Sequence, residues 1–493
     1  MTHATPDFSY GGGVIDTASD RMGEAGTARD VGTWRELFAN HLGTSVVLAG
    51  GVALYATNEF LTVSLLPSAI SEIGGSRLYA WVTTLYLVGS VISATTVNAM
   101  LTRVGARSSF MTALGIFGVA SMMCASAPSI GVLIAGRALQ GVAGGLLAGL
   151  SYALINTTLP RSLWTRGPAL VSAMWGVATL VGPAMGGVFA QLGLWRWAFG
   201  AMVILTALMA LLVRAVLPVG DADRSDETPV TKVPVWSLLL VGIAALSISV
   251  AQLPHYFSAT AGLLAAGALI VGVFVVVDMR MHAAVLPPSV FGRGPLKWIY
   301  LTIALQIVAV MLGTYVPLFG QRLGHLTPVG AGFLGAVLAF GWTVAELVSA
   351  SLTDKRIVSG VIASAPLVMA AGLGLAAITQ RDNAPISTVV LWGLGLLVSG
   401  IGIGMAWPHL SMRAMSSVKD PAEGGAAAAA INTVQLIAAA FGAGVAGVVV
   451  NTTQGGDVIA ARSLYTTFVA LAALGFFASY NAIFRHRLAA GIA

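Results

Sequence analysis

Long apolar stretches recur along almost the whole chain once its first residues are passed. A helix that crosses a membrane needs about 20 consecutive, largely apolar residues, and we count 14 runs of this kind. Strands of a membrane β-barrel would instead show alternating segments of about ten residues. The sequence therefore predicts an all-α integral membrane protein. The predicted helices are at residues 44–70, 79–101, 109–126, 130–157, 167–192, 196–217, 234–252, 256–278, 297–320, 330–353, 359–379, 386–409, 422–451 and 463–486.

The composition agrees with a membrane protein and excludes several other classes. Hydrophobic residues make up 57% of the chain and charged residues only 9%, whereas a soluble domain carries about 25% charged residues. This excludes a soluble enzyme and a disordered scaffold. The net charge is +6, but the basic residues are scattered and form no stripe of the kind that binds nucleic acid. The single cysteine, Cys124, cannot form a disulfide within the chain.

The basic residues favour one side of the predicted membrane protein. Cytoplasmic connections carry an excess of Lys and Arg, and basic residues gather in alternate connections, such as the segments 102–107 and 353–356. This pattern places both termini in the cytoplasm of a cell whose inner or plasma membrane holds the protein. Residues 1–43 are interpreted as a flexible cytoplasmic tail.

The two short basic segments, 102–107 and 353–356, each follow the second helix of a predicted half. Repeated helical halves are common in transporters. We therefore predict two six-helix bundles separated by an inserted helix pair. The predicted parts are the tail 1–43, the first bundle 44–217, a cytoplasmic linker 218–233, the inserted helix pair 234–278, a second linker 279–296 and the second bundle 297–487.

Three charged residues lie inside apolar runs: Glu59, Arg137 and Glu346. Each costs about 2.5–3.5 kcal/mol to insert, so such residues are candidates for function. At 100° per residue, Tyr55, Glu59 and Thr62 are expected to share one face of the first helix, turned toward a wet cavity. Glu59 and Arg137 lie at similar depths in their helices, so their side chains could meet.

Two interpretations of the Glu59–Arg137 pair remain open at the level of the sequence. The pair could be a buried structural ion pair that fixes helix packing. Alternatively, motion of Arg137 relative to Glu59 could switch the carboxyl group between holding and releasing a proton. Glu346 is likewise either a support for the neighbouring loop or a secondary acidic site in a cavity.

Several motifs resemble those of one transporter family. The run Gly136–Gly141 resembles motif B of the major facilitator superfamily, and Gly182, Pro183, Gly186 and Gly187 resemble its antiporter motif C. The run Trp81–Leu87 resembles the second helix of the 14-helix drug:proton antiporter branch. A further set of residues resembles the thirteenth helix of that branch: Gly424, Gly425, Asn432, Thr433, Gln435 and Gly442. The resemblance implies the major facilitator fold with 14 transmembrane helices.

The chain departs from the branch at two places. Where the branch has an Asp in its first helix, this chain has Asn58, with Glu59 beside it. In the loop after the second helix, Thr102 replaces the usual acidic residue of motif A. The remaining charged and glycine positions of the two corresponding loops are interpreted as cytoplasmic gating residues: Arg103, Gly105, Arg107, Asp354 and Arg356.

The resemblance implies proton-coupled efflux of amphipathic small molecules or drugs by alternating access. Glu59 is the expected proton carrier, Arg137 its switch, and the antiporter motif the rocking interface. The expected partners are the lipid bilayer, protons and an amphipathic substrate, and we expect a monomer. The predicted cavity residues are Tyr55, Asn58, Phe60, Thr62, Gln140, Met174, Trp175, Gln306, Tyr315, Trp342, Asn432 and Gln435.

No cofactor or metal is expected. The chain has no Walker pattern for ATP, so we expect no direct ATP engine. An ion gradient would then supply the energy. The alternatives are an uptake symporter or facilitator of a small metabolite, and a non-transporting membrane receptor or scaffold. An intramembrane enzyme would need convergent acid, base or metal groups, and the scattered histidines do not supply them.

Overall fold

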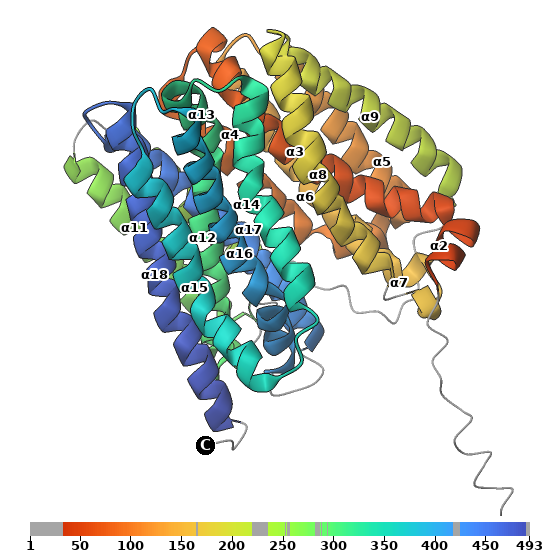
Figure 1. Cartoon of the computed structure of the whole chain (residues 1–493). Helices are drawn as coiled ribbons and strands as arrows, with labels where there is room; N and C mark the ends of the chain where they lie inside the picture. Colours follow the sequence, from red (N-terminus) through yellow and green to blue (C-terminus); the bar gives the residue numbers. More distant parts are fainter. Residues whose placement is uncertain are drawn as a thin grey trace, which may run out of the picture.

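The computed structural model describes residues 33–163, 166–218, 235–251, 253, 257–281, 286, 288–292, 294–417 and 424–489. Nearly all of these residues are helical (Figure 1). The predicted all-α membrane fold is confirmed. Most of the predicted tail and almost all of the linker 218–233 lie outside the described residues.

Helices of the first part of the chain pack mainly on one another. Helix α3 contacts α6, α8 and α9, while α6 also contacts α4 and α5. We call these helices the first group. The bounds are α2 Trp34–Asn40, α3 Leu42–Ile73, α4 Tyr79–Ala94, α5 Val97–Ala125, α6 Ile130–Ala153, α7 Ile155–Thr158, α8 Arg166–Gln191 and α9 Trp195–Val216.

Helices of the last part of the chain form a second group. Helix α16 packs on α14 and α15, and α18 packs on α12 and α15. A 3-10 turn at Met311–Tyr315 joins α12 to α13. The bounds are α12 Leu296–Val310, α13 Val316–Gly324, α14 Pro328–Ser349, α15 Lys355–Thr379, α16 Ile386–Ser416, α17 Gly424–Thr452 and α18 Asp457–Ala489.

The two groups meet along two boundaries, which we call the α8–α14 seam and the α4–α17 seam. The inserted helices are α10 (Val235–Val250) and α11 (Phe257–Asp278). Helix α10 contacts both α4 and α17, and α11 packs chiefly on α10. The inserted pair therefore lies against the α4–α17 seam.

Twelve helices among the described residues are long and apolar enough to cross a membrane. The other two predicted spans are the shorter helices α4 and α10, with 16 residues each. A turn at Thr95 and Thr96 ends α4 early, and their hydroxyl groups bond to the carbonyl oxygens of Ile92 and Ser93 at 2.8 and 2.7 Å. Such local bonds compete with helix continuation. The layout is compatible with 14 spans.

The chain reverses direction at Gly105, inside the segment that the sequence predicts as a basic loop. Gly105 has φ 77° and ψ 169°, which interrupts the helical conformation of α5. A residue with a Cβ would be strained there, because positive φ favours glycine. Gly105 therefore separates the continuation of α4 from the membrane-crossing part of α5.

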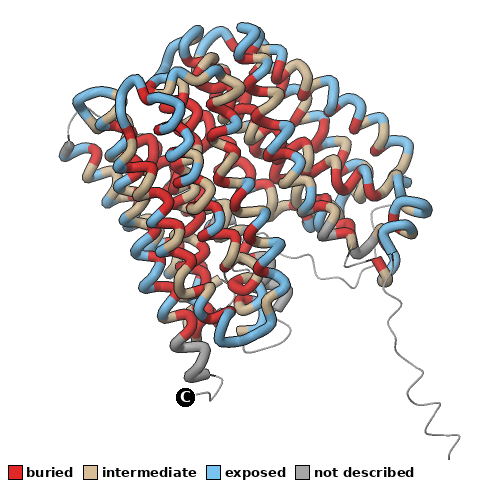
Figure 2. The backbone as a smooth tube through the Cα atoms, in the orientation of Figure 1, coloured by how far each residue is buried: buried red, intermediate tan, exposed pale blue. Residues whose placement is uncertain are grey.

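Burial is concentrated inside the helix groups, whereas exposed residues occupy the ends and outer sides (Figure 2). Large apolar side chains on the outer sides are exposed, such as Trp197 at 63%, as expected of surfaces that face lipid. We call the end that carries α2 the α2 end, and the opposite end, where α4 begins, the Tyr79 end. At the Tyr79 end, Tyr79 stacks on Tyr315 with ring centroids 4.7 Å apart.

Candidate functional site

The centre of α3 has a single partly accessible face. Within residues 51–67, all are buried except Ala53, Glu59, Phe60 and Val63. At 100° per residue these four positions fall within about one third of the helix circumference. Glu59 therefore presents a half-buried carboxylate in the middle of a membrane-spanning helix, where a charge is costly.

The prediction that Tyr55, Glu59 and Thr62 together face a wet cavity is wrong. Tyr55 is only 3% exposed and Thr62 is fully buried. Tyr55 stacks on Tyr86 of α4 at 5.5 Å and meets the edge of Trp175 of α8 at 5.7 Å. The Thr62 hydroxyl donates to the Asn58 carbonyl oxygen at 2.7 Å. Neighbouring helices cover both side chains, and periodicity alone does not reveal which side of α3 they cover.

Gln140 of α6 connects three helices of the first group. Its Oε1 accepts hydrogen bonds from Nη1 of Arg137 at 2.8 Å and from Nδ2 of Asn58 at 3.4 Å. Its Nε2 donates to the Ser121 hydroxyl of α5 at 2.9 Å. The Cys124 Sγ lies 3.6 Å from the same Oε1. Gln140 therefore fixes the position of the Arg137 guanidinium relative to α3.

Arg137 is 1% exposed, and its guanidinium lies 4.0 Å from the centroid of the Tyr86 ring. Such a cation–π contact stabilises a buried charge. The Tyr86 hydroxyl donates to the Tyr55 carbonyl oxygen at 2.9 Å, which holds the ring in place. The hydrogen bond to Gln140 and the contact with the Tyr86 ring therefore secure Arg137 within the first group.

Arg137 and Glu59 interact electrostatically. However, the ion pairs found among the described residues do not include them. The expected direct meeting of these two side chains is therefore absent from this conformation. The Gln140 amide and the Tyr86 ring are the groups in contact with the guanidinium instead.

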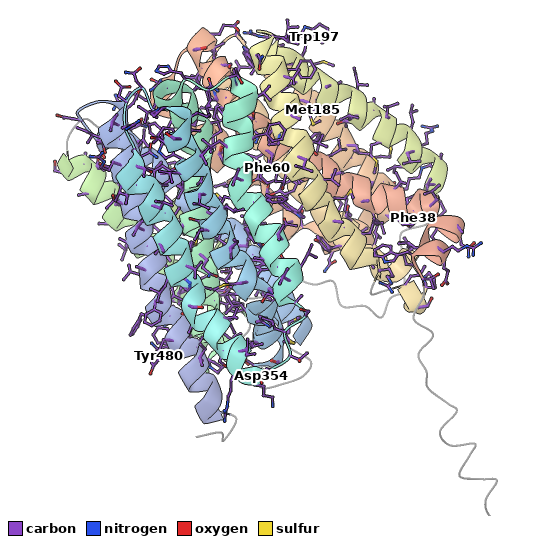
Figure 3. The ribbon with its side chains drawn as sticks, viewed as in Figure 1. Phe38, Phe60, Met185, Trp197, Asp354 and Tyr480 are labelled. Carbon is purple, nitrogen blue, oxygen red and sulfur yellow. The ribbon has the colours of Figure 1, made fainter. Side chains whose placement is uncertain are left out.

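The predicted antiporter motif lies where α8 packs on α3 and α14. A Cβ at Gly182 would lie 2.5 Å from the Cβ of Phe60, and one at Gly186 would clash with the Leu61 carbonyl oxygen. Both glycines therefore allow α8 to touch α3 (Figure 3 labels Phe60 beside α8). A Cβ at Gly187 would lie 2.6 Å from the Cα of Val329 on α14.

A hydrogen bond accompanies these close backbone contacts. The Ser64 hydroxyl of α3 donates to the Pro183 carbonyl oxygen of α8 at 3.3 Å. Ser64 also faces α14, because a Cβ at Gly332 would clash with the Ser64 Oγ. The motif thus brings α3, α8 and α14 together toward the Tyr79 end.

Glu346 lies in α14 beside two tryptophans. The Trp342 Nε1 donates to the Glu346 carboxylate at 3.0 Å, and the rings of Trp342 and Trp407 meet at 5.1 Å. Glu346 is half-buried and has no ion pair within the described part of the chain. Near the end of the same helix, the Ser349 hydroxyl lies 3.0 Å from His409 Nε2. The structure therefore places Glu346 in an aromatic setting in the second group.

The remaining predicted cavity residues are dispersed. Gln306 is fully buried in α12, while Met174 and Gln435 are half-buried. Tyr315 packs against Tyr79 at the Tyr79 end, so it joins the two groups there. The side chain of Asn432 lies outside the description.

The predicted gating residues occupy the α2 end, where Figure 3 labels Asp354. The Asp354 carboxylate accepts hydrogen bonds from the backbone N–H groups of Arg356 at 2.7 Å and Ile357 at 3.0 Å. These bonds hold the pKa of Asp354 below its ordinary value. Arg103 is exposed and Arg107 half-buried, and neither forms an ion pair across the described residues. Asp354 therefore acts as the N-cap of α15.

Three residues that contact Arg137 or Gln140 are absent from the predicted site: Tyr86, Ser121 and Cys124. All three have no formal charge and lie in apolar runs. For Tyr86, the available signal is its place in the run Trp81–Leu87, whereas Ser121 and Cys124 lie in no motif that the sequence singles out. No cluster of His, Cys, Asp or Glu that could hold a metal ion occurs among the described residues.

The structure defines a membrane transporter: two groups of membrane-spanning helices meet along two seams, and both groups contain charged residues. Residues 48–443 match the family model of the Major Facilitator Superfamily. The chain belongs to that superfamily, as its motifs predict.

Relatives and solved structures agree with this assignment. A probable multidrug-efflux transporter of Mycobacterium tuberculosis (strain ATCC 25618 / H37Rv) is 70% identical over 464 residues, which cover 94% of this chain and 98% of the relative. A puromycin resistance protein of Streptomyces alboniger is 29% identical, covering 81% and 80% respectively. The crystal structure of the nucleoside transporter NupG matches with a TM-score of 0.63 at 13% identity, over 90% of this chain and 98% of that one. The last likeness concerns the fold alone.

Proposed function

We propose that this protein exports amphipathic small molecules in exchange for protons, by alternating access. The relative that is 70% identical is named a probable multidrug-efflux transporter, and a more distant relative is named for puromycin resistance. The first name describes efflux of drugs, and the second describes resistance to a drug. We extend that direction of transport to this chain.

The observation that carries the proposal is the half-buried Glu59 carboxylate on the accessible face of α3. It has no ion pair among the described residues, although it interacts electrostatically with Arg137. A carboxyl group in such a setting changes its proton affinity when its exposure or its distance from a cation changes. Movement of α3 relative to Arg137 and Gln140 would then couple proton binding to a change of conformation.

The location and orientation follow from the basic residues. Arg103 and Arg107 flank the break at Gly105, and Lys355 and Arg356 begin α15, so all four lie at the α2 end. An excess of Lys and Arg marks the cytoplasmic side of a membrane protein. We therefore propose that the protein lies in a bacterial-type cell membrane and that its α2 end faces the cytoplasm. One chain supplies both helix groups, so a monomer is sufficient for transport.

Glu346 and its two tryptophans are proposed as part of the substrate contact. Tryptophan faces offer adaptable apolar area and attract cations. The Trp342 indole holds the Glu346 carboxylate at 3.0 Å. A compound with an apolar body and a polar group would find both kinds of contact there.

Replacement of Glu59 by Gln tests the proton-carrier role. The amide is similar in size but cannot bind and release a proton at neutral pH. In everted vesicles with an imposed pH gradient, we expect Glu59→Gln to abolish export of a dye panel while dye binding to the purified protein remains measurable. Glu36→Gln, in the short helix α2, is the matched control and should export normally.

An uncoupler added to wild-type vesicles gives the second measurement. Collapse of the pH gradient should stop export by the wild type. Full gradient-driven export by Glu59→Gln would refute the assignment of the proton site. Uptake rather than export by the wild type would instead support a symporter.

A further inference from the structure

The α8–α14 seam is tight at one end and loose toward the other. At Gly187, an added Cβ would lie 2.6 Å from the Cα of Val329. At Gly176, the one described atom within 4 Å of such a Cβ is the Thr343 Cγ2, at 3.9 Å. These two glycines are separated by about 16 Å along the helix. The contact between the two groups therefore weakens along this seam toward the α2 end.

The Gly176–Thr343 contact separates two different surfaces. On α14, Phe340 and Leu347 lie to one side of Thr343 and are 53% and 72% exposed. Trp342 and Glu346 lie to its other side and are half-buried. An exposed apolar flank of the membrane domain is therefore separated from a carboxylate and an indole by one thin contact.

Helix α8 shows the same division. Val177, one position beyond Gly176, is 46% exposed. Trp175, one position before it, turns about 100° the other way and meets Tyr55 of α3 at 5.7 Å. Thr343 presents its methyl group to Gly176, because its hydroxyl bonds to the Ala339 carbonyl oxygen at 3.1 Å. Among the described side chains of α8, none lies within 4 Å of a Cβ added at Gly176.

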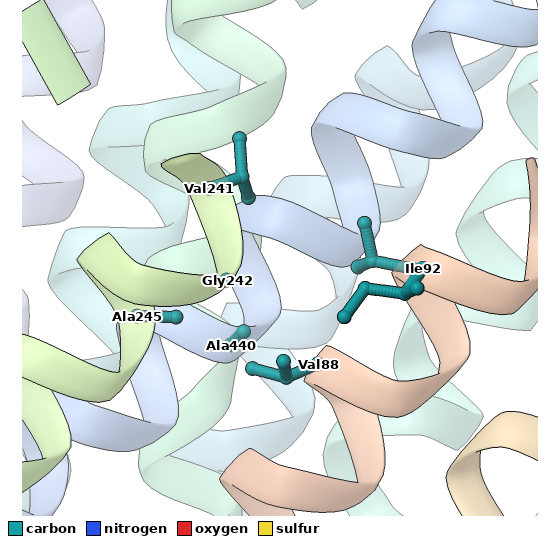
Figure 4. Close-up of a pocket in the computed structure, with 7 residues that line it drawn as sticks. Val88, Ile92, Val241, Gly242, Ala245 and Ala440 are labelled. Atoms are coloured by element: carbon teal, nitrogen blue, oxygen red, sulfur yellow. The ribbon is translucent and has the colours of Figure 1, made fainter. Parts of the chain in front are cut away.

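The α4–α17 seam is covered along its length by α10. Gly242 of α10 lies beside Ile92 and Val88 of α4, and Ile248 of α10 lies beside Gly444 of α17. Figure 4 shows the small apolar pocket where these three helices meet, with side chains from each helix around it. The pocket is far too small for an organic substrate, since its volume is about 10 Å³.

Hydrogen bonds secure α10 at the Tyr79 end of this seam. The Trp81 Nε1 of α4 donates to the Ser249 carbonyl oxygen at 2.9 Å. The Arg77 guanidinium donates to the Leu253 carbonyl oxygen at 2.6 Å, and Asn451 of α17 donates to the Arg77 carbonyl oxygen at 2.8 Å. The inserted helix is thus joined to the first group, which is itself joined to α17.

From this asymmetry we propose that substrates already dissolved in the bilayer enter through the α8–α14 seam at Gly176 and Thr343, and that α10 blocks the α4–α17 seam. The proposal rests on the export function proposed above. An amphipathic compound concentrates in the membrane because its apolar part leaves water. Entry at Gly176 would bring it from lipid to Trp342 and Glu346 without passage of its apolar part through water.

Two glycines provide a matched test, because each has similar free space at its seam. A Cβ at Gly176 would have its nearest neighbour at 3.9 Å, and one at Gly242 at 3.7 Å. Gly176→Phe would fill the α8–α14 seam, and Gly242→Phe would add the same bulk at the covered seam. Thr343→Phe fills the first seam from the opposite helix, should Gly176→Phe fail to fold.

The measurement is the initial rate of export in reconstituted vesicles. The probes are a short-chain and a long-chain N-alkyl derivative of one fluorescent amine, which differ chiefly in their partition into lipid. We expect Gly176→Phe to cause a several-fold loss for the long-chain probe relative to the short-chain probe. Gly242→Phe should leave the ratio of the two rates as in the wild type.

Each other outcome has a defined meaning. An equal loss for both probes in Gly176→Phe and Thr343→Phe, or no loss for either, overturns the membrane route. The same selective loss in Gly242→Phe would overturn the assigned asymmetry. If the wild type exports neither probe nor any dye of the panel under a pH gradient, the proposed function itself fails.

Discussion

The two seams between the helix groups are built in different ways. At the α8–α14 seam, Gly187 of α8 lies against the Val329 backbone of α14, and Gly332 of α14 lies against the Ser64 side chain of α3 and near the Pro183 carbonyl oxygen of α8. At the α4–α17 seam, the third helix α10 lies across the boundary. The Trp81 side chain bonds to a carbonyl group of α10, and the Arg77 side chain bonds to the Leu253 carbonyl group just beyond its end. One seam is a bare glycine contact and the other is a covered, hydrogen-bonded one.

This difference indicates which boundary separates more readily. Glycine contacts depend on close fit and leave few interlocking side chains to disengage. The covered seam would have to break the hydrogen bonds of Trp81, Arg77 and Asn451 and also separate α10 from α4 or α17. We therefore expect the larger opening and closing movement at the α8–α14 seam, with α10 moving as part of the first group.

The largest effect is expected where the bare seam is tightest. Gly187→Leu would place side-chain atoms against the Val329 backbone, which cannot move aside without separating α8 from α14. Overpacking of this kind costs about 1–3 kcal/mol. We expect a clear fall in Tm and loss of dye export. Gly115→Leu in α5, where no atom lies within 4 Å of an added Cβ, is the control.

A normal Tm and normal export in Gly187→Leu would mean that the bare seam is not closed at Gly187. A defect of equal size in Gly115→Leu would assign the loss to glycine replacement in general. Either result would remove the contrast between the two seams.

A smaller effect is expected at the covered seam. Trp81→Phe retains an aromatic ring but removes the donor to the Ser249 carbonyl oxygen. Loss of one such bond costs about 1 kcal/mol. We expect a modest fall in Tm with export retained. Trp197→Phe, at an exposed position of α9, should leave both unchanged; abolished export in Trp81→Phe would show that the covered seam also moves.

The smallest effect is expected at Asp354, a helix cap that belongs to neither seam. Its pKa is lowered by the backbone donors of Ile357 and Arg356. The stabilisation is therefore fully present above the unfolded-state pKa of about 4 and is lost as pH falls through the folded-state pKa. Asp354→Ala should show a slightly lower Tm at neutral pH, while Asp354→Asn retains the cap.

Thermal melts of the two Asp354 variants across pH check this expectation. The difference between wild type and Asp354→Ala should stay constant from neutral pH downward and shrink only in strong acid. A difference that disappears near neutral pH would show that another group controls α15. Unchanged export in both variants would show that Asp354 acts as a cap alone, whereas a loss of export would support the gating role that its sequence position predicts.

The sequence predicted the membrane-spanning helices well, because a span requires about 20 consecutive, largely apolar residues. It also located the reversal near Gly105, since basic residues and glycine mark a loop. It did not reveal that Thr95 and Thr96 end α4 early, because their bonds to backbone carbonyl groups depend on local geometry.

The sequence located the charged residues of the candidate site but not the side chains that they contact. Charge inside an apolar run identified Glu59 and Arg137, and the structure places both centrally. The sequence could not show that Arg137 contacts Gln140 and Tyr86, because partner choice depends on helix rotation and rotamers. Neutral residues such as Ser121 leave no charge signal at all.

The burial of Cys124 has a practical consequence for measuring these movements. This thiol is the chain's only cysteine and is fully buried beside the Gln140 amide. Thiol-reactive spin labels or fluorophores attached at engineered surface cysteines would therefore face little competition from the native sulfur. Distances across both seams can be recorded in the natural background, without a substitution that would disturb the neighbours of Arg137.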